Sequence, residues 1–186
     1  MMQKLWLKKL KLNYKDVFDI VQFGSSVIEN TSPEDVDIAV IFNKIPLKEQ
    51  LEKAQKIKKQ IQKETELPIH IKSFDLYSFF EESNFARENI LFYGKSFFLK
   101  KSFAYRFGLK PVIQVNYSLK GLKKKDKIRF NYMLNGKKGS YGLLRKYSGE
   151  LIAPGVIEIL PENENIFVSS IEKFKVRFKI KKIMIS

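Results

Sequence analysis

Two aspartates at the start of an apolar run most constrain what this chain can fold into. Asp35-Val36-Asp37 leads directly into residues 38–42, which are all apolar, as in a buried β-strand. Because the side chains of a strand alternate between its faces, Asp35 and Asp37 are predicted to project from the same face. Neighbouring carboxylates repel each other unless a cation lies between them, and oxygen ligands suit Mg²⁺. The pattern therefore predicts a divalent metal site at Asp35 and Asp37.

A Gly-Ser dipeptide precedes these aspartates. Gly24 and Ser25 follow an apolar run at residues 20–23, and nine residues separate Ser25 from Asp35. A glycine at this place permits a tight turn from a strand into a helix, and the N–H groups and hydroxyl of such a turn can bind phosphate oxygens. We therefore expect Gly24 and Ser25 to contact phosphate. The alternative is a surface turn followed by an acidic strand edge.

Taken in order, these elements resemble the signature of the DNA polymerase β-like nucleotidyltransferase superfamily. Its pattern is an apolar residue, Gly-Ser, a short spacer and then Asp-x-Asp within an apolar strand, and all of these are present here. The resemblance covers residues 14–99 and is greatest to the minimal nucleotidyltransferases, which are small stand-alone domains. It implies a polymerase β-like α/β sheet domain that binds an NTP together with Mg²⁺ or Mn²⁺.

The resemblance also implies roles for individual residues. Asp35 and Asp37 would hold two metal ions and be catalytic, while Gly24 and Ser25 would bind the β- and γ-phosphates of the nucleotide. In the family, a third carboxylate on the third strand helps to bind the catalytic metal and activates the acceptor. The basic residues that often follow Gly-Ser in the family are replaced here by an uncharged segment at residues 26–28.

The third strand departs from the family's pattern. Residues 67–74 alternate as a strand whose isoleucines face inward, so His70 and Lys72 share the face where the third carboxylate belongs. The nearest acids, Glu66 and Asp75, lie away from the centre of the strand. His70 is the closest match, because a neutral imidazole can bind a metal or accept a proton. Two interpretations stay open: His70 completes the catalytic set, or it is a partly buried structural histidine in a domain that has lost catalysis.

The apolar pattern of the first half predicts a small α/β sheet. The expected strands cover residues 19–23, 36–42 and 67–74. Between the second and third strands, residues 47–64 predict an amphipathic helix that begins after Pro46. Its apolar positions follow a spacing of four, three, three and four, at Leu47, Leu51, Ala54, Ile57 and Ile61. This order of elements fits a sheet with helices packed on it.

Shorter elements complete this half of the chain. Residues 76–89 predict one or two short helices. Residues 90–95 resemble the end of minimal nucleotidyltransferase domains, where an apolar helix runs into a glycine before a short strand. Residues 3–12 alternate leucine with lysine, which predicts a short helix or strand packed against the first domain.

The second half predicts a small α+β domain. Strands are expected over residues 111–117 and 176–185, and a strand pair over residues 150–160 around the turn dipeptide Pro154-Gly155. Helices are expected over residues 122–134, 141–147 and 165–174, with a basic turn at residues 135–140. A helix, a short basic turn, a second helix and a hairpin follow one another in winged helix-turn-helix domains, so a winged-helix-like fold is one interpretation.

Charge divides the chain into the same two halves. Residues 1–99 contain 15 Lys/Arg and 14 Asp/Glu, a net charge of +1, whereas residues 100–186 contain 20 and 6, a net charge of +14. A Lys-rich genome would raise lysine in both halves, but only the first half balances its lysines with acids. We therefore predict a nucleotidyltransferase-like domain at residues 1–99 and a basic domain at residues 100–186 that binds nucleic acid.

Composition excludes several other classes of protein. The chain has no cysteine and one histidine, so disulfide frameworks and zinc sites are not expected. No apolar run approaches the ~18 residues of a membrane span, and the N-terminus lacks the features of a signal peptide. We expect a cytoplasmic protein without a membrane partner. No phosphate-binding loop, dinucleotide-binding fingerprint or serine nucleophile motif is evident.

Two functions are consistent with these features. The first is a metal-dependent nucleotidyltransferase that moves a nucleoside monophosphate from an NTP to a nucleic-acid or protein acceptor. The second is a catalytically degenerate domain of the same fold that binds nucleic acid, or that binds a partner protein as antitoxin-like members of the family do. The identity of the nucleotide, the acceptor and the oligomeric state stay open at this point.

Overall fold

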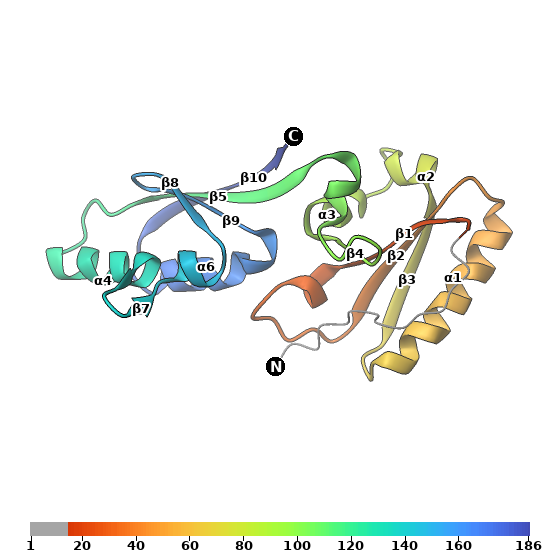
Figure 1. Ribbon diagram of the computed structural model, residues 1–186, viewed down its shortest axis with the longest axis horizontal. Coiled ribbons are helices and arrows are strands. Elements are labelled where there is room, and N and C mark those ends of the chain that lie inside the picture. Colours follow the sequence, from red (N-terminus) through yellow and green to blue (C-terminus); the bar gives the residue numbers. More distant parts are fainter. Residues whose placement is uncertain (1–14) are drawn as a thin grey trace. The chain divides into compact units, whose positions relative to one another are not determined.

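The computed structural model describes residues 15–186, which form two compact units (Figure 1). The described part of the first unit comprises residues 15–27 and 31–109, and the second unit comprises residues 28–30 and 110–186. The first unit thus extends ten residues beyond the boundary expected after residue 99. The leucine–lysine alternation at residues 3–12 lies outside the described residues.

The first unit is built on a four-stranded mixed sheet with the strand order β3-β2-β1-β4. Its strands are β1 (Val17–Phe23), β2 (Val36–Phe42), β3 (Ile69–Asp75) and β4 (Lys95–Ser96). β1 pairs antiparallel with β2 and β4, whereas β2 pairs parallel with β3. A parallel pair needs a long crossover, which is the helix predicted between these strands. The expected α/β sheet is confirmed.

Helix α1 (Leu47–Ile61) covers one face of this sheet and is followed by the 3₁₀ turn η2 (Gln62–Glu64). Its inward stripe contains Ala54, Ile57 and Ile61, as predicted, which pack against Ile20, Ile38, Val40 and Ile69 among others. The first turn differs from the prediction, because Leu47 and Leu51 are exposed and Gln50 is buried. The Gln50 amide nitrogen donates to the Ile45 carbonyl at 3.1 Å and to Asp75 Oδ2 at 3.4 Å.

Three short helical segments cover part of the opposite face of the sheet. They are α2 (Leu76–Phe80), α3 (Arg87–Tyr93) and the 3₁₀ turn η3 (Phe103–Phe107). Phe79, Ile90 and Phe103 are fully buried and pack against Ala39 and Ile41 of β2. Phe79 and Phe103 meet edge to face with ring centroids 5.7 Å apart, a favourable aromatic geometry. This packing explains why residues 100–109 belong to the first unit.

The second unit contains a four-stranded antiparallel sheet with the order β10-β5-β9-β8. Its strands are β5 (Lys110–Ser118), β8 (Glu150–Ala153), β9 (Val156–Ile159) and β10 (Arg177–Ile185). β8 and β9 form the strand pair predicted around Pro154-Gly155, and the φ of Gly155 is +84° as this tight turn requires.

Helices α4 (Lys124–Asn135) and α6 (Glu164–Glu172) contribute buried residues to the second unit. A small hairpin of β6 (Gly136–Lys137) and β7 (Ser140–Tyr141) follows α4 and leads into the short helix α5 (Leu143–Lys146). Phe130 of α4 lies 5.1 Å from the ring of Tyr117 in β5 and 5.5 Å from that of Phe174. The unit is α+β, as predicted, and its winged-helix interpretation stays a prediction.

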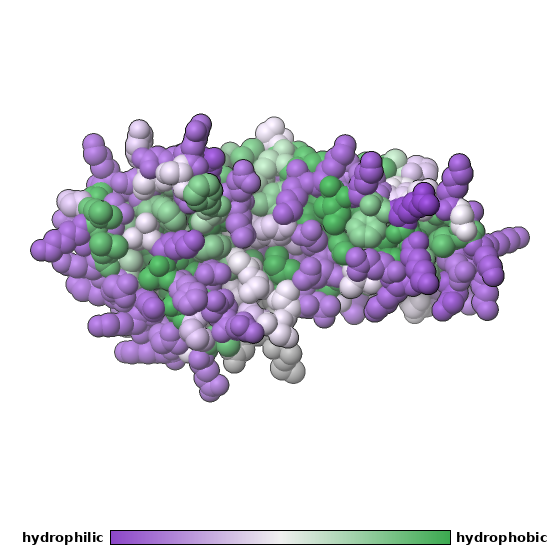
Figure 2. Space-filling view, turned by 180° about the vertical axis from the view of Figure 1, so that it is seen from behind, coloured by the Kyte–Doolittle hydropathy of each residue, from purple (hydrophilic) through white to green (hydrophobic). Residues whose placement is uncertain are grey.

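Hydrophilic side chains cover most of the face shown in Figure 2, in keeping with a chain in which 30% of residues are charged. Within residues 15–186, no helix combines the length and apolarity needed to cross a membrane.

Candidate active site

The register between β2 and β3 brings three candidate residues together. Asp37 is the direct partner of His70 in this parallel pair, and Asp35 lies just before β2. His70 Nδ1 is 3.1 Å from Asp35 Oδ2 and 3.9 Å from Asp37 Oδ1. One potential ligand atom from each residue lies within 4.8 Å of the others. Asp35, Asp37 and His70 therefore form one cluster, although 32 residues separate Asp37 from His70.

This cluster lies at the end of a sheet face, beyond the part that α2, α3 and η3 cover. Asp37, Ala39 and Ile41 alternate on the same side of β2, as the two-residue period of a strand requires. Ala39 and Ile41 are buried beneath the helical segments of that face, whereas Asp37 and His70 are not. The side chains of Asp37 and His70 are 29% and 61% exposed. The imidazole of His70 is therefore not packed into the core.

The carboxylates influence each other electrostatically. Burial raises the pKa of Asp37 above 3.8, and the neighbouring Asp35 charge raises it further, because both disfavour the ionised form. Coulombic interactions with His70 and Lys72 act in the opposite direction on the same pKa. A bound divalent cation would supply much more positive charge at this place and keep both carboxylates ionised.

The donor set fits a divalent metal ion. Adjacent ligands of an octahedral Mg²⁺ lie about 3 Å apart, since each metal–oxygen bond is about 2.1 Å. The separations in this cluster are 4.8 Å or less, so small side-chain rotations would bring the donors into range. Two carboxylates suit Mg²⁺ or Mn²⁺, and the imidazole favours transition metals such as Mn²⁺ over Mg²⁺.

Gly24 lies against this cluster. Phe23, the last residue of β1, pairs with Asp37, and the chain then turns sharply into the 3₁₀ turn η1 (Gly24–Val27). The φ of Gly24 is +74°, and a Cβ at this position would lie 2.4 Å from Asp37 Oδ2. The positive φ favours glycine here, and any larger residue would have to displace the Asp37 carboxylate. The predicted turn is therefore present, and it is adjacent to the carboxylate.

We predict that Gly24→Ala displaces the Asp37 carboxylate and lowers stability. The added methyl group would collide with Asp37 Oδ2, and alanine disfavours a positive φ by about 1 kcal/mol or more. Urea denaturation should show lower stability, and calorimetry should show weaker Mn²⁺ binding. Gly139→Ala is the matched control, since Gly139 also has a positive φ but no atom within 4 Å of an added Cβ. Loss of stability in both variants with metal binding retained in both would contradict the role of Gly24.

The serines of the turn differ in what they contact. Ser25 is exposed, and its carbonyl accepts a hydrogen bond of 2.8 Å from the Thr31 hydroxyl. Ser26 is buried, donates to the Phe23 carbonyl at 3.1 Å and accepts from Gln22 Nε2 at 3.1 Å. The side chain of Ser26 therefore stabilises the turn, and Ser25 faces solvent. Sequence reasoning missed the contributions of Gln22, Ser26 and Thr31, which no motif indicates.

Neither nearby acid replaces the missing third carboxylate. Asp75 caps α2: its side chain accepts a hydrogen bond of 2.7 Å from the Ser78 N–H, and this bond lowers the pKa of Asp75. It pairs with Phe42, at the far end of β3 from His70. Glu66 is exposed and precedes the strand. A depression of about 620 Å³ is lined by Lys72 and Asp75, among others, but not by Asp35, Asp37 or His70.

The family model described as nucleotidyltransferase domain matches residues 4–97, half of the chain. The matched range contains the Gly-Ser turn, both aspartates and His70. No curated protein and no solved structure matches the chain significantly.

Proposed function

The chain belongs to the nucleotidyltransferase domain family, and from that premise we propose that it is a metal-dependent nucleotidyltransferase. It would move a nucleoside monophosphate from an NTP to a hydroxyl of a nucleic-acid or protein acceptor. One observation carries this proposal: Asp35, Asp37 and His70 offer ligand atoms within 4.8 Å of one another, directly beside the Gly24 turn.

Each residue of the cluster has a role in this proposal. Asp35 and Asp37 would hold the divalent ions, Mg²⁺ or Mn²⁺, and the backbone N–H groups of Gly24 and Ser25 would contact the β- and γ-phosphates. When bound there, the ions would neutralise the negative charge of the triphosphate. His70 would be the third ligand of the bound ion, in place of the family's third carboxylate. The oxygen of the acceptor hydroxyl bonds to the α-phosphorus while the bond to the β-phosphate oxygen breaks, pyrophosphate leaves and the hydroxyl proton passes to solvent.

Lys72 compensates for the uncharged segment after Gly-Ser. It lies two residues beyond His70 on the same side of β3, and its charge acts on the pKa of Asp37. An exposed ammonium group at this place would attract the phosphates of a nucleotide. The role that basic residues near the turn have in the family would then be taken by a lysine on β3.

His70 also supports a second candidate function. An imidazole stands where the family has its third carboxylate, so the cluster has one negative charge fewer for a second metal ion. A domain of this kind would bind nucleic acid through the basic unit, or bind a partner protein in the antitoxin-like manner, without transferring nucleotides.

Nucleotide transfer decides between the two functions. The full-length protein would be incubated with each labelled NTP, Mg²⁺ or Mn²⁺, and RNA or protein acceptors, beside the Asp35→Asn/Asp37→Asn variant. We expect label on an acceptor with the wild type and none above background with the variant. Transfer that persists in the variant would contradict the assigned site, and no transfer with any NTP and acceptor would favour the degenerate domain.

Substitutions of His70 test its place in the site. We predict that His70→Asp raises Mg²⁺-dependent transfer, or at least Mg²⁺ affinity, because it restores a negative charge beside Asp35. His70→Ala should lower activity, and the wild type should work better with Mn²⁺ than with Mg²⁺. Because His70 is exposed, His70→Ala should keep the melting temperature of the wild type. His70→Asp adds a third carboxylate to the cluster, so it should keep that melting temperature only when a divalent ion is present. Unchanged metal affinity in His70→Asp together with a large loss of stability would show that the residue has been misassigned.

A further inference from the structure

Two exposed tyrosines lie in a segment that the candidate active site does not use. Tyr132 is on α4 and Tyr141 is on β7, and they are 45% and 69% exposed. Each ring has a cation near its face: Lys137 Nζ is 5.6 Å from the centroid of Tyr132, and Arg145 Cζ is 4.1 Å from that of Tyr141. Contacts of this kind orient a ring while leaving much of it open to solvent.

Helical spacing places Tyr132 on the outward side of α4. Phe130 and Leu134 are fully buried, and they flank Tyr132 two positions away on either side, about 200° around the helix. Ile128 and Arg129, four and three residues before Tyr132, share its exposed side. Tyr132 therefore does not contribute to the core, and its ring and its basic neighbours are available to a ligand.

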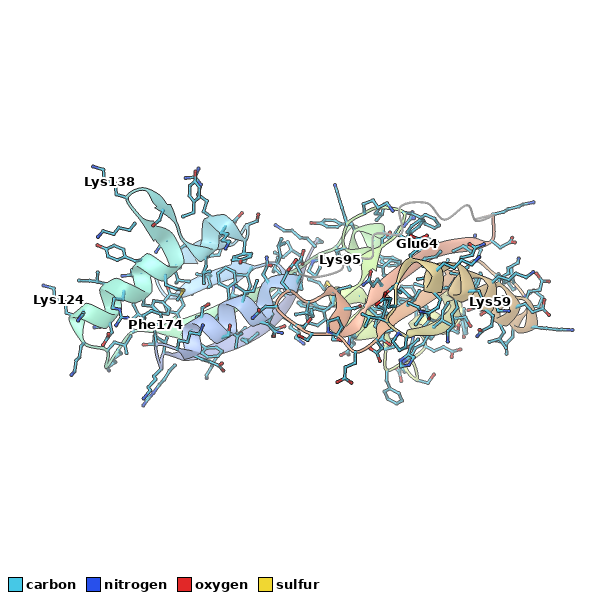
Figure 3. The ribbon with its side chains drawn as sticks, turned by 90° about the horizontal axis from the view of Figure 1, so that it is seen from below. Lys59, Glu64, Lys95, Lys124, Lys138 and Phe174 are labelled. Atoms are coloured by element: carbon cyan, nitrogen blue, oxygen red, sulfur yellow. The ribbon has the colours of Figure 1, made fainter. Side chains whose placement is uncertain are left out.

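The surrounding charge is strongly positive. Residues 124–146, which we call the basic–aromatic segment, contain eight Lys/Arg and one acid, Asp126. Asp126, the one acid of the segment, pairs with Arg129: its Oδ1 lies 3.8 Å from Arg129 Nη1. Lys124 at the start of α4 and Lys138 near the tip of the β6–β7 hairpin both project away from the unit (Figure 3). Such a surface attracts polyanions.

The combination of open rings and cations indicates a particular polyanion. Bases of a single strand present flat faces that stack on tyrosine, and its phosphates pair with lysine and arginine. A duplex hides those faces, and an acidic peptide offers charge without a comparable stacking group. We propose that the basic–aromatic segment binds single-stranded nucleic acid, with bases stacked on Tyr132 and Tyr141. This inference rests on the proposed function, for which it supplies the class of acceptor.

A second basic surface provides a control. Arg177, Lys179 and Lys181 are exposed on β10, the edge strand of the second sheet. Lysines at a sheet edge protect it against pairing with other chains, and this explains them without a ligand. Their partners in β5 across the sheet are Ser118, Asn116 and Gln114, which offer no ring for stacking. Substitutions there remove the same charge without touching the tyrosines.

The test measures fluorescence anisotropy of labelled oligonucleotides with the full-length protein, in EDTA and without NTP. The probes are an oligouridylate of about twelve nucleotides, an abasic strand of equal length and a duplex of equal length. Tyr132→Leu/Tyr141→Leu should weaken oligouridylate binding about 25-fold or more, while Tyr132→Phe/Tyr141→Phe stays close to the wild type. The wild type should prefer oligouridylate to the abasic strand and to the duplex, and the leucine variant should lose the preference over the abasic strand.

Charge variants separate stacking from phosphate contacts. Lys125→Gln/Lys138→Gln should reduce the slope of log affinity against log salt by about 1.4, because each phosphate contact on a single strand contributes about 0.7. The leucine variant should keep the wild-type slope, and Lys179→Gln/Lys181→Gln should change neither slope nor affinity appreciably. Wild-type affinity in the leucine variant, or equal affinity for abasic and uridine strands, would overturn the proposal. So would binding of polyglutamate without binding of any oligonucleotide.

These outcomes are distinguishable from those of the proposed function. Binding is measured without metal and nucleotide, so it does not depend on Asp35 or Asp37. A protein that binds oligouridylate through its tyrosines but transfers no nucleotide would contradict only the proposed nucleotidyltransferase function. Transfer to a protein acceptor without binding of single strands would contradict only the present inference.

Discussion

Replacing Asp35 and Asp37 together by asparagine is expected to abolish the binding of Mn²⁺ that the wild type shows in calorimetry. The two carboxylates are the negatively charged donors of the cluster, and amide oxygens are weaker ligands without charge. His70 alone would then be left to hold the ion. We expect heat of binding from the wild type and none above dilution from the double variant.

The same substitution should leave the metal-free protein at least as stable as the wild type. The folded-state pKa of Asp37 is raised above 3.8, so ionisation of this group costs free energy in the folded protein. This cost is absent below pH 3.8, sets in as pH rises, and is fully present above the raised pKa. Asparagine removes it, whereas a carboxylate that merely supported the fold would give the opposite result.

A control with the same change of charge makes this test specific. Glu52 on α1 and Glu64 on η2 are exposed, and α1 covers the opposite face of the sheet. Glu52→Gln/Glu64→Gln should therefore bind Mn²⁺ as the wild type does. Equal binding by the wild type and the Asp35→Asn/Asp37→Asn variant would exclude the metal site.

Removing the Asp19 side chain is expected to be among the most destabilising single changes in the first unit. Asp19 is fully buried in β1, and its Oδ2 accepts hydrogen bonds from Ser96 Oγ at 2.7 Å and from Arg106 Nε at 2.8 Å. These contacts join β1 to β4 and to η3. Asp19→Ala would leave the buried Ser96 hydroxyl and a half-buried guanidinium without this partner. We expect a loss of about 3 kcal/mol in urea denaturation.

Asp16→Ala is the control for this measurement. Asp16 also pairs with a cation, since Lys53 Nζ lies 2.6 Å from its Oδ2, but both side chains are more than a third exposed. Solvent-exposed pairs contribute little to stability, because water and salt screen them. The two variants should therefore differ clearly in their urea midpoints. A loss for Asp19→Ala as small as that for Asp16→Ala would show that the buried carboxylate does not join these elements.

Arg106 shows that part of the positive charge counted after residue 99 belongs to the first unit. Its guanidinium is bound to Asp19 and lies 5.4 Å from the centre of the Phe18 ring, so it contributes to the first unit. Residues 100–109 contain three of the 20 basic residues counted after residue 99. The excess of positive charge persists without them, with 17 Lys/Arg and six Asp/Glu in residues 110–186. Any role in nucleic-acid binding is thus better sought beyond residue 109.

The sequence by itself determined the three main strands of the first unit and the helix that joins β2 to β3. A two-residue period gives strands, and the apolar run at residues 36–42 was recognisable as β2 without a structure. Helix α1 followed from a period near 3.6, and the Gly-Ser turn and the aspartates followed from local spacing. These features depend on residues close together in the chain, so a local pattern is enough to predict them. The family match to residues 4–97 agrees with that interpretation.

The tertiary structure alone decided which distant residues meet. Asp19 and Arg106 are 87 residues apart, and no periodicity relates them. Gln50 is buried in place of Leu47 and Leu51 because Ile45 and Asp75 offer acceptors to its amide. The pairing of Asp37 with His70 depends on the register of two parallel strands, and a shift by one residue would turn His70 to the other face. Register is fixed by the packing of the whole sheet, which no single segment of the chain encodes.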